Sequence, residues 1–142
     1  MQSGESMVVY RYQDLIAWQM ADSFKQEVFR LVHDSSKAST DFRFRGQLLA
    51  AAQSVAANIA EGFLRNSPGD FRRFLHIALG SLGEAEGRLR DGILLGYFSS
   101  AACAPAFQFG KRCATASVRL RKSQESFMKS GKQRTEPEDP RT

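Results

Sequence analysis

Apolar residues recur along this chain at alternating intervals of three and four positions, in four separate stretches. In the first stretch, residues 12–34, this stripe consists of Ala17, Ala21, Phe24, Val28 and Leu31. A stripe with this period covers one face of an α-helix and leaves the opposite face for polar residues. The same spacing predicts three further helices, over residues 42–65, 68–95 and 105–129.

Four long helices joined by short polar segments predict an all-α fold. Short connections place consecutive helices side by side and antiparallel, so we expect an up-down-up-down four-helix bundle over residues 10–129. Residues 1–9 have no long apolar stretch and are expected to form a flexible N-terminus. Residues 130–142 contain no apolar side chain to anchor them, which predicts a disordered tail.

The third predicted helix has the clearest start. Ser67 can cap it, Pro68 suits the first helical position, and Asp70 places negative charge in the first turn. Residues 35–41, which precede the second helix, are mostly small and polar and are predicted to form a turn.

Two features indicate packing surfaces beyond a simple bundle core. Beside its stripe, the first helix carries a second apolar line formed by Leu15, Trp18, Phe29 and Val32. The third helix carries glycines at positions 80, 83 and 87, each of which costs roughly 1 kcal/mol relative to alanine. The surplus apolar line favours oligomerisation, and the glycines favour close approach by another helix, such as the alanine-rich second one. The alternatives are a wide core-facing stripe and a long helix that tolerates its glycines.

Length and composition are those of one globular domain, with 142 residues of which 42% are hydrophobic and 25% charged. The net charge is +5, and residues 105–129 hold six basic side chains against one acidic side chain. This asymmetry favours an acidic partner, for which nucleic acid is the commonest candidate. A solvated helix face explains the same charges equally well.

Common catalytic and metal sites need residue spacings that this chain lacks. Neither His33 nor His76 follows a glutamate by three positions, so the Glu-x-x-His of di-iron bundles is absent. No Gly-x-Ser-x-Gly elbow, Cys/His pair or phosphate-binding glycine loop occurs. Cys103 and Cys113 have no partners at zinc-site spacing and are expected to be reduced and buried. We therefore expect no enzyme activity, no metal and no other cofactor.

Targeting segments are missing as well. The first nine residues do not resemble a secretory signal, and every apolar run is far shorter than the ~20 residues of a membrane span. We expect a cytoplasmic protein without a membrane partner.

Five polar residues border the apolar stripes of the second and third helices: Ser54, Asn58, Glu61, Ser81 and Glu84. Asn58 and Glu61 are three positions apart, as are the two residues of the third helix, so each pair shares a helix face. Carboxylates this close to a core require hydrogen-bond or charge partners. We interpret the set as an interhelical network that fixes the register, completed by Arg65 or Arg88. The alternative is a polar pocket.

These residues belong to a longer pattern. It comprises Asp14-Leu15, Trp18-Gln19, Gln47-Leu48, Ser54-Val55, Asn58-Ile59-Ala60-Glu61-Gly62-Phe63, Phe74-Leu75, Ile77-Ala78, Gly80-Ser81-Leu82, Glu84 and Leu95-Gly96-Tyr97. Over about positions 10–98 the chain thereby resembles the four-helix bundle family of the 23S rRNA intervening-sequence protein. The resemblance implies an all-α bundle, a homopentameric ring and no enzyme activity, and the family name points to an RNA-related role.

The chain also departs from the family pattern at two places. The family commonly has a basic pair after Gln-Leu, where this chain has Leu49 and Ala50, and often a proline after Ser-Val, where it has Ala56. Loss of the basic pair weakens the inference of nucleic-acid binding through that face.

The leading hypothesis is a non-catalytic, ring-forming protein that binds RNA or DNA through basic surface residues. The candidate phosphate contacts are Arg43, Arg45, Arg65, Arg72, Arg73, Lys111, Arg112, Arg119, Arg121 and Lys122. Phenylalanines at positions 42, 44, 71 and 74 are candidates for base stacking, although their place on apolar stripes favours a core role. The alternative is a homo-oligomeric scaffold or adaptor that binds another protein and no nucleic acid. A third hypothesis, an enzyme, requires a pocket that gathers Glu61, Glu84 and a histidine.

Overall fold

The computed structural model describes residues 9–131, which form helices and contain no strand. The elements are η1 (Tyr12–Asp14), α1 (Ile16–Asp34), α2 (Ser36–Thr40), α3 (Phe42–Leu64), α4 (Pro68–Leu94) and α5 (Ser100–Lys129). The prediction of an all-α protein with four long helices is confirmed. The predictions for the two ends of the chain fall on residues 1–8 and 132–142, which lie outside the described residues, apart from Val9, Ser130 and Gly131.

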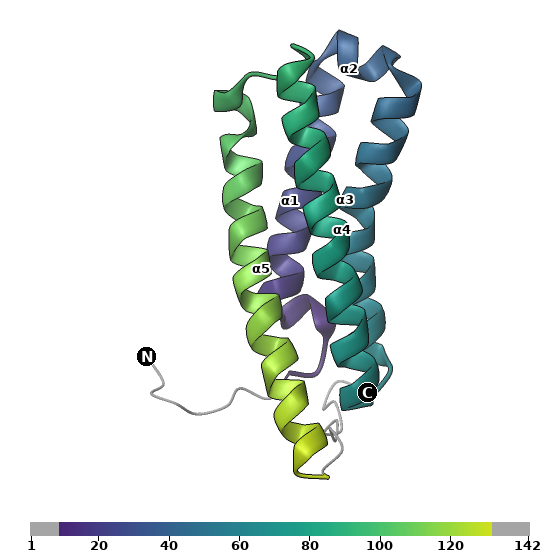
Figure 1. The fold of residues 1–142 in the computed structure, drawn as a ribbon, viewed down its shortest axis with the longest axis vertical. Coiled ribbons are helices and arrows are strands. Elements are labelled where there is room, and N and C mark those ends of the chain that lie inside the picture. Colours follow the sequence, from purple (N-terminus) through teal and green to yellow (C-terminus); the bar gives the residue numbers. More distant parts are fainter. Residues whose placement is uncertain (1–8, 132–142) are drawn as a thin grey trace.

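The four long helices lie side by side as a bundle (Figure 1). Helix α1 packs against α3 and α5, and α4 packs against the same two helices. The connections from α1 to α3 and from α4 to α5 lie at one end of the bundle, and the connection from α3 to α4 lies at the other (Figure 1). For the functional site, the important consequence is that α5 has two neighbours, α1 on one side and α4 on the other.

The apolar stripe predicted for the first helix lies in the core, whereas in α5 Cys103, Ala106 and Cys113 are buried and Phe127 is 37% exposed. All five residues of the first stripe are buried, and they belong to one cluster with the buried residues of α3, α4 and α5. Among the larger fully buried side chains are Phe24, Leu48, Leu75 and Leu89. Each such side chain stabilises the fold by roughly 1.5–3 kcal/mol relative to an exposed position.

Side-chain caps start helices α2 to α5, whereas α1 has none. The Ser67 hydroxyl accepts a hydrogen bond from the Asp70 amide (3.4 Å), which confirms the predicted start of α4. Asp41 caps α3 by accepting from the Phe44 amide (3.2 Å), and its other carboxylate oxygen accepts from the Tyr97 hydroxyl (2.7 Å). Asp41 therefore ties the start of α3 to the connection after α4.

Three boundaries differ from the predictions. Helix α5 begins at Ser100, five positions before the predicted start, because Ser99 caps it and alanines around Pro105 sustain the first turns. Pro105 is the sixth residue of α5, where a proline removes one helical hydrogen bond and crowds the carbonyl four residues earlier, so it lies inside the helix and does not mark its start. The predicted turn over residues 35–41 contains the short helix α2, capped by Ser35. The first helix is interrupted at Leu15, whose backbone is extended.

The predicted close approach at the glycines of α4 is wrong within the subunit. A Cβ atom added at Gly80, Gly83 or Gly87 would meet nothing within 4 Å. Close packing occurs instead at Gly62, where an added Cβ would lie 2.7 Å from the Phe74 Cβ atom, and at Gly92 and Gly110. The three α4 glycines therefore leave an open helix surface.

The second apolar line of α1 is mostly covered by the subunit itself. Leu15 and Val32 are buried, and Trp18 packs edge-on against Tyr12 with ring centroids 5.4 Å apart. Trp18 is partly buried, and Phe29, with 38% of its surface exposed, is the most accessible residue of this line. The arrangement supports the wide core-facing stripe rather than a surplus face.

Candidate nucleic-acid interface

Basic residues from the start of α4 and the end of α5 meet around one surface hollow. Its lining residues are Gly69, Arg72, Arg73, His76, Arg121 and Glu125, and its volume is about 530 Å³. We call it the α4/α5 hollow. The ion pair between Arg72 and Glu125 (3.0 Å) joins the two helices at this point. The hollow combines three of the predicted phosphate contacts with one histidine.

A fourth predicted arginine lies beside the hollow. The guanidinium groups of Arg65 and Arg73 both lie over the ring of Phe74, at 5.2 and 4.5 Å from its centroid. Phe74 is half-buried because its Cβ atom packs closely on Gly62. The aromatic ring therefore positions two cations next to each other at the end of α3 and the start of α4.

Each of three arginines in this region has an acidic neighbour. Arg72 pairs with Glu125, Arg73 with Asp70 (3.7 Å) and Arg65 with Glu61 (2.9 Å). The hydrogen bond from Arg72 holds the pKa of the Glu125 carboxyl below its usual range. All of these side chains are substantially exposed, and such pairs contribute about 0–1 kcal/mol each. A phosphate can therefore replace the carboxylates at little cost.

The aromatic residues offer little surface for base stacking. Phe44 and Phe71 are buried, and Phe74 is covered by two guanidinium groups. Phe42 is 69% exposed, but Arg45 lies over its ring at 5.1 Å. Contacts at the α4/α5 hollow would therefore go to phosphates.

The other predicted basic residues lie elsewhere. Arg43 and Arg45 are at the start of α3, about 33 and 30 Å along the helix from Arg65. The remaining four are exposed along α5: Lys111, Arg112, Arg119 and Lys122. Arg119 lines a different hollow from Arg121, although the two are only two positions apart. The ten predicted residues therefore do not share one surface.

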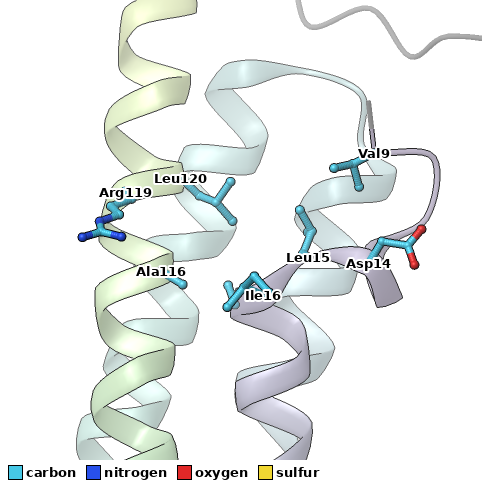
Figure 2. Close-up of a pocket in the computed structure, with 8 residues that line it drawn as sticks. Val9, Asp14, Leu15, Ile16, Ala116, Arg119 and Leu120 are labelled. Atoms are coloured by element: carbon cyan, nitrogen blue, oxygen red, sulfur yellow. The ribbon is translucent and has the colours of Figure 1, made fainter. Parts of the chain in front are cut away.

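A second, apolar hollow lies between α1 and α5 (Figure 2), with a volume of about 600 Å³. Its lining residues are Val9, Asp14, Leu15, Ile16, Ala17, Ala116, Arg119 and Leu120. We call it the α1/α5 hollow. Ile16 is 57% exposed and points into it from α1, and Leu120 faces it from α5 (Figure 2).

The polar set at the motif residues separates into two groups. The Ser54 and Ser81 hydroxyls are hydrogen-bonded across α3 and α4 at 2.8 Å, and the Asn58 amide donates to the Ser54 hydroxyl at 2.8 Å. This is the predicted register network. Glu61 and Glu84 do not join it, because each is about half exposed and pairs along its own helix. Their partners are the arginines expected to complete the network, Arg65 and Arg88.

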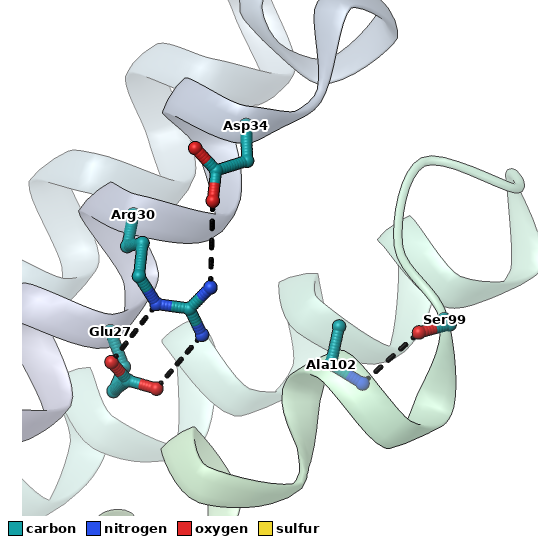
Figure 3. Close-up of polar contacts among 5 residues, drawn as sticks. All are labelled: Glu27, Arg30, Asp34, Ser99 and Ala102. Atoms are coloured by element: carbon teal, nitrogen blue, oxygen red, sulfur yellow. Dashed lines mark hydrogen bonds and ion pairs between the residues drawn. The ribbon is translucent and has the colours of Figure 1, made fainter.

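The upper part of α1 is occupied by a local ion network. The Arg30 guanidinium donates to both oxygens of Glu27 (3.2 and 3.0 Å) and contacts Asp34 at 3.5 Å (Figure 3). The hydrogen bond from Arg30 lowers the pKa of Glu27. This arginine already has two carboxylate partners, so it is a poor candidate for a phosphate contact.

Three titratable side chains inside the bundle have a pKa raised by burial: Cys103, Cys113 and Glu86. Cys103 and Cys113 are buried, and burial raises the pKa of the Cys113 thiol to about 11. Burial also raises the pKa of Glu86, whose carboxylate packs where Gly110 leaves room. Within residues 9–131, no three histidine, cysteine, aspartate or glutamate residues gather as metal ligands. No described helix has the length and apolar character to cross a membrane.

Two members of the α4/α5 hollow were missed from the sequence. His76 was considered only as a metal ligand, and Glu125 is the one acidic residue counted in residues 105–129. The signal for both is the helical spacing from Arg72 to His76 and from Arg121 to Glu125, because residues four apart share a face.

Comparison with known proteins identifies the family. A crystal structure of a protein with unknown function, from the S23 ribosomal protein family of Bacteroides thetaiotaomicron, is similar to this one with a TM-score of 0.52 and 23% sequence identity. The similarity covers 80% of this chain and 98% of that one, and at this identity it concerns the fold. No curated protein matches the chain. The family model of the 23S rRNA-intervening sequence protein matches residues 13–117, and the chain belongs to this family.

Proposed function

We propose that this protein is a non-catalytic nucleic-acid-binding protein that contacts RNA or DNA phosphates through the α4/α5 hollow. The observation that carries the proposal is the convergence of Arg72, Arg73, His76 and Arg121 on one hollow, with Arg65 beside it. Guanidinium groups present several N–H donors in a fixed plane that matches phosphate oxygens. Contacts to phosphate alone carry no sequence information, so binding should show little sequence preference.

The proposed binding unit is a homopentameric ring of up-down-up-down bundles in the cytoplasm. The resemblance of the motif residues supports the ring, and short connections between long neighbouring helices favour the antiparallel topology. A ring would carry the hollow five times, and linked sites raise the apparent affinity for a long nucleic acid. Light scattering should give a mass near five times the chain mass of 15.8 kDa, and a monomer mass would refute the ring.

Filter binding to mixed RNA and DNA tests the binding function. We expect retention at about 50 mM salt and its loss by about 300 mM, because phosphate contacts release counterions. The variant Arg72→Gln/Arg73→Gln/Arg121→Gln should bind at least tenfold more weakly. The matched control, Lys37→Gln/Arg43→Gln/Lys111→Gln, removes the same charge from exposed positions outside the hollow and should bind within twofold of the unaltered protein. Absence of retention by the unaltered protein at the lowest salt would refute the proposal.

One observation favours the alternative, a homo-oligomeric scaffold that binds another protein. Phe42, Leu94 and Leu95 lie at the same end of the bundle and are 69%, 85% and 55% exposed. Exposed apolar side chains at one place favour a protein partner. If nucleic acid is not retained, loss of partner binding by Leu94→Ser/Leu95→Ser would support this function instead.

A further inference from the structure

The α1/α5 hollow has a matching surface on the opposite side of the same chain. Two contacts give the register between α4 and α5: Arg72 pairs with Glu125, and the Glu86 carboxylate packs against Gly110. Because the two helices run in opposite directions between these contacts, residues 116–120 of α5 lie level with about residues 76–80 of α4. The α1/α5 hollow therefore lies at the same height along the bundle axis as Ile77 and Gly80.

Ile77 faces away from the hollow, on the α3/α4 side of the bundle. It lies four positions before Ser81, so the two share a helix face. The Ser81 hydroxyl bonds to Ser54 of α3, which places this face along the seam between α3 and α4. That seam is across the bundle from the seam between α1 and α5, since each helix of one pair packs on one helix of the other.

Both surfaces are apolar, and one is a hollow whereas the other carries an exposed side chain. Ile77 is an apolar side chain with 40% of its surface exposed. Gly80 is exposed beside it, and a Cβ atom there would meet nothing within 4 Å. A branched apolar side chain next to a bare helix surface can enter a hollow of about 600 Å³ lined by Ile16, Ala116 and Leu120.

The charges around the two surfaces are complementary as well. Arg112 and Arg119 are exposed on α5 one above the other, seven positions apart, and the part of the chain that the structure describes provides neither with an ion pair. Glu84 lies level with Arg112 by the same register and is 54% exposed. Its pair with Arg88 is an exposed pair within one helix and is weak enough to be replaced.

We propose that the α1/α5 hollow of one subunit receives Ile77 of a second copy of this chain. This inference rests on the proposed ring. Rotation about an axis parallel to the bundle keeps every residue at its own height, so the level match between the hollow and Ile77 is what a ring requires. A hollow and its matching surface on different sides of one chain make a head-to-tail contact, which forms a ring when the rotation between neighbouring copies closes.

Cysteine cross-linking tests the contact. We would mix the variants Ile77→Cys and Ala116→Cys under mild oxidation and look for disulfide-linked dimers on a non-reducing gel. Oxidation of the double variant should give a series of disulfide-linked oligomers on the same gel. Each single variant alone should remain unlinked, because a head-to-tail contact never brings two copies of one position together. Cys103 and Cys113 are buried and do not compete. Gly83→Cys, on the open surface of α4, is the control for Ile77→Cys and should not link to Ala116→Cys.

A second variant measures the assembly directly. Ile77→Asp should reduce the mass in light scattering to that of one chain, 15.8 kDa, with an unchanged circular dichroism spectrum because Ile77 is not in the core. If the unaltered protein is a monomer, the ring and this contact are both wrong. If the unaltered protein is an oligomer but the mixture gives no cross-link and Ile77→Asp keeps its mass, only this contact is wrong.

Discussion

Helix α5 presents two different surfaces to its two neighbours, and they come from residues that are close in sequence. Toward α4 it contributes Arg121 and Glu125 to a hollow lined by charged side chains. Toward α1 it contributes Ala116 and Leu120 to a hollow that is mostly apolar, with Arg119 at its edge. Under the two proposals, the same basic segment would contact a nucleic acid on one side and a second copy of the chain on the other. The net charge of α5 does not distinguish the two surfaces. The helix that each surface faces, α4 or α1, does distinguish them.

The largest expected effect concerns the packing of Gly62 against Phe74, which lies beside the α4/α5 hollow. Gly62→Ala would place a Cβ atom 2.7 Å from the Phe74 Cβ atom, and neither atom can move without shifting a helix. We expect a loss of about 2 kcal/mol in the free energy of unfolding, measured by urea denaturation, because overpacking outweighs the helix propensity of alanine. The control Gly83→Ala meets no atom and should gain up to about 1 kcal/mol. Equal effects of the two substitutions would contradict this account of the packing.

The second prediction compares the two sides of α5 directly. Arg121→Glu should weaken binding of a short RNA about tenfold, because it places a carboxylate in the charged hollow. Arg119→Glu makes the same charge change two positions away, on the other side, and should alter binding by less than twofold. Fluorescence anisotropy with a labelled oligonucleotide measures both. A larger effect of Arg119→Glu would reverse the assignment of the two surfaces.

A smaller effect is expected at the register network between α3 and α4. Ser54→Ala removes the hydroxyl that bonds to Ser81 and accepts from Asn58, so we expect a loss of about 1 kcal/mol in thermal or urea unfolding. Glu61→Gln, in contrast, breaks only an exposed pair and should cost less than about 0.5 kcal/mol. Nucleic-acid binding should be unchanged in Ser54→Ala if the network is structural, and a tenfold loss of binding would show otherwise.

The smallest expected effect is a pH dependence of the free energy of unfolding, caused by Glu86 between α4 and α5. Burial raises the pKa of Glu86 in the folded protein above its unfolded value. The folded state therefore holds this proton more tightly, and the associated stability is present at low pH and is lost as the pH rises through the folded pKa. Relative to the unaltered protein, Glu86→Gln should become progressively more stable between about pH 4 and pH 7, by less than about 1 kcal/mol. A constant difference across this range would mean that Glu86 titrates as an exposed carboxyl.

Much of the fold followed from the sequence because the signals are local. The stripe of α1 and the cap at Ser67 were predicted from the periods and side chains of single segments, and both were found. The start of α5 was missed because proline is common at the first position of a helix, whereas Pro105 is the sixth residue of α5 and the Ser99 cap sets its start.

The site was less predictable because it depends on which helices are neighbours. The periodicity of α5 does not reveal that Arg121 faces α4 while Arg119 faces α1. The register network was foreseen at Ser54, Asn58 and Ser81, since these residues border apolar stripes. Glu61 and Glu84 were placed wrongly in that network. Each lies slightly farther around its helix than the seam residues, so its long side chain reaches solvent.

The central claim is that the charged hollow binds phosphates, and the salt dependence of binding to a ten-nucleotide RNA tests it most directly. Each lost phosphate contact should reduce the slope of log K against log salt by about 0.7 to 0.9. We predict that Arg72→Gln/Arg73→Gln/Arg121→Gln reduces the slope by about 2 to 3, while Lys37→Gln/Arg43→Gln/Lys111→Gln leaves it unchanged. Equal slopes for the two variants would contradict the claim, since the hollow would then contribute no more than any other basic surface.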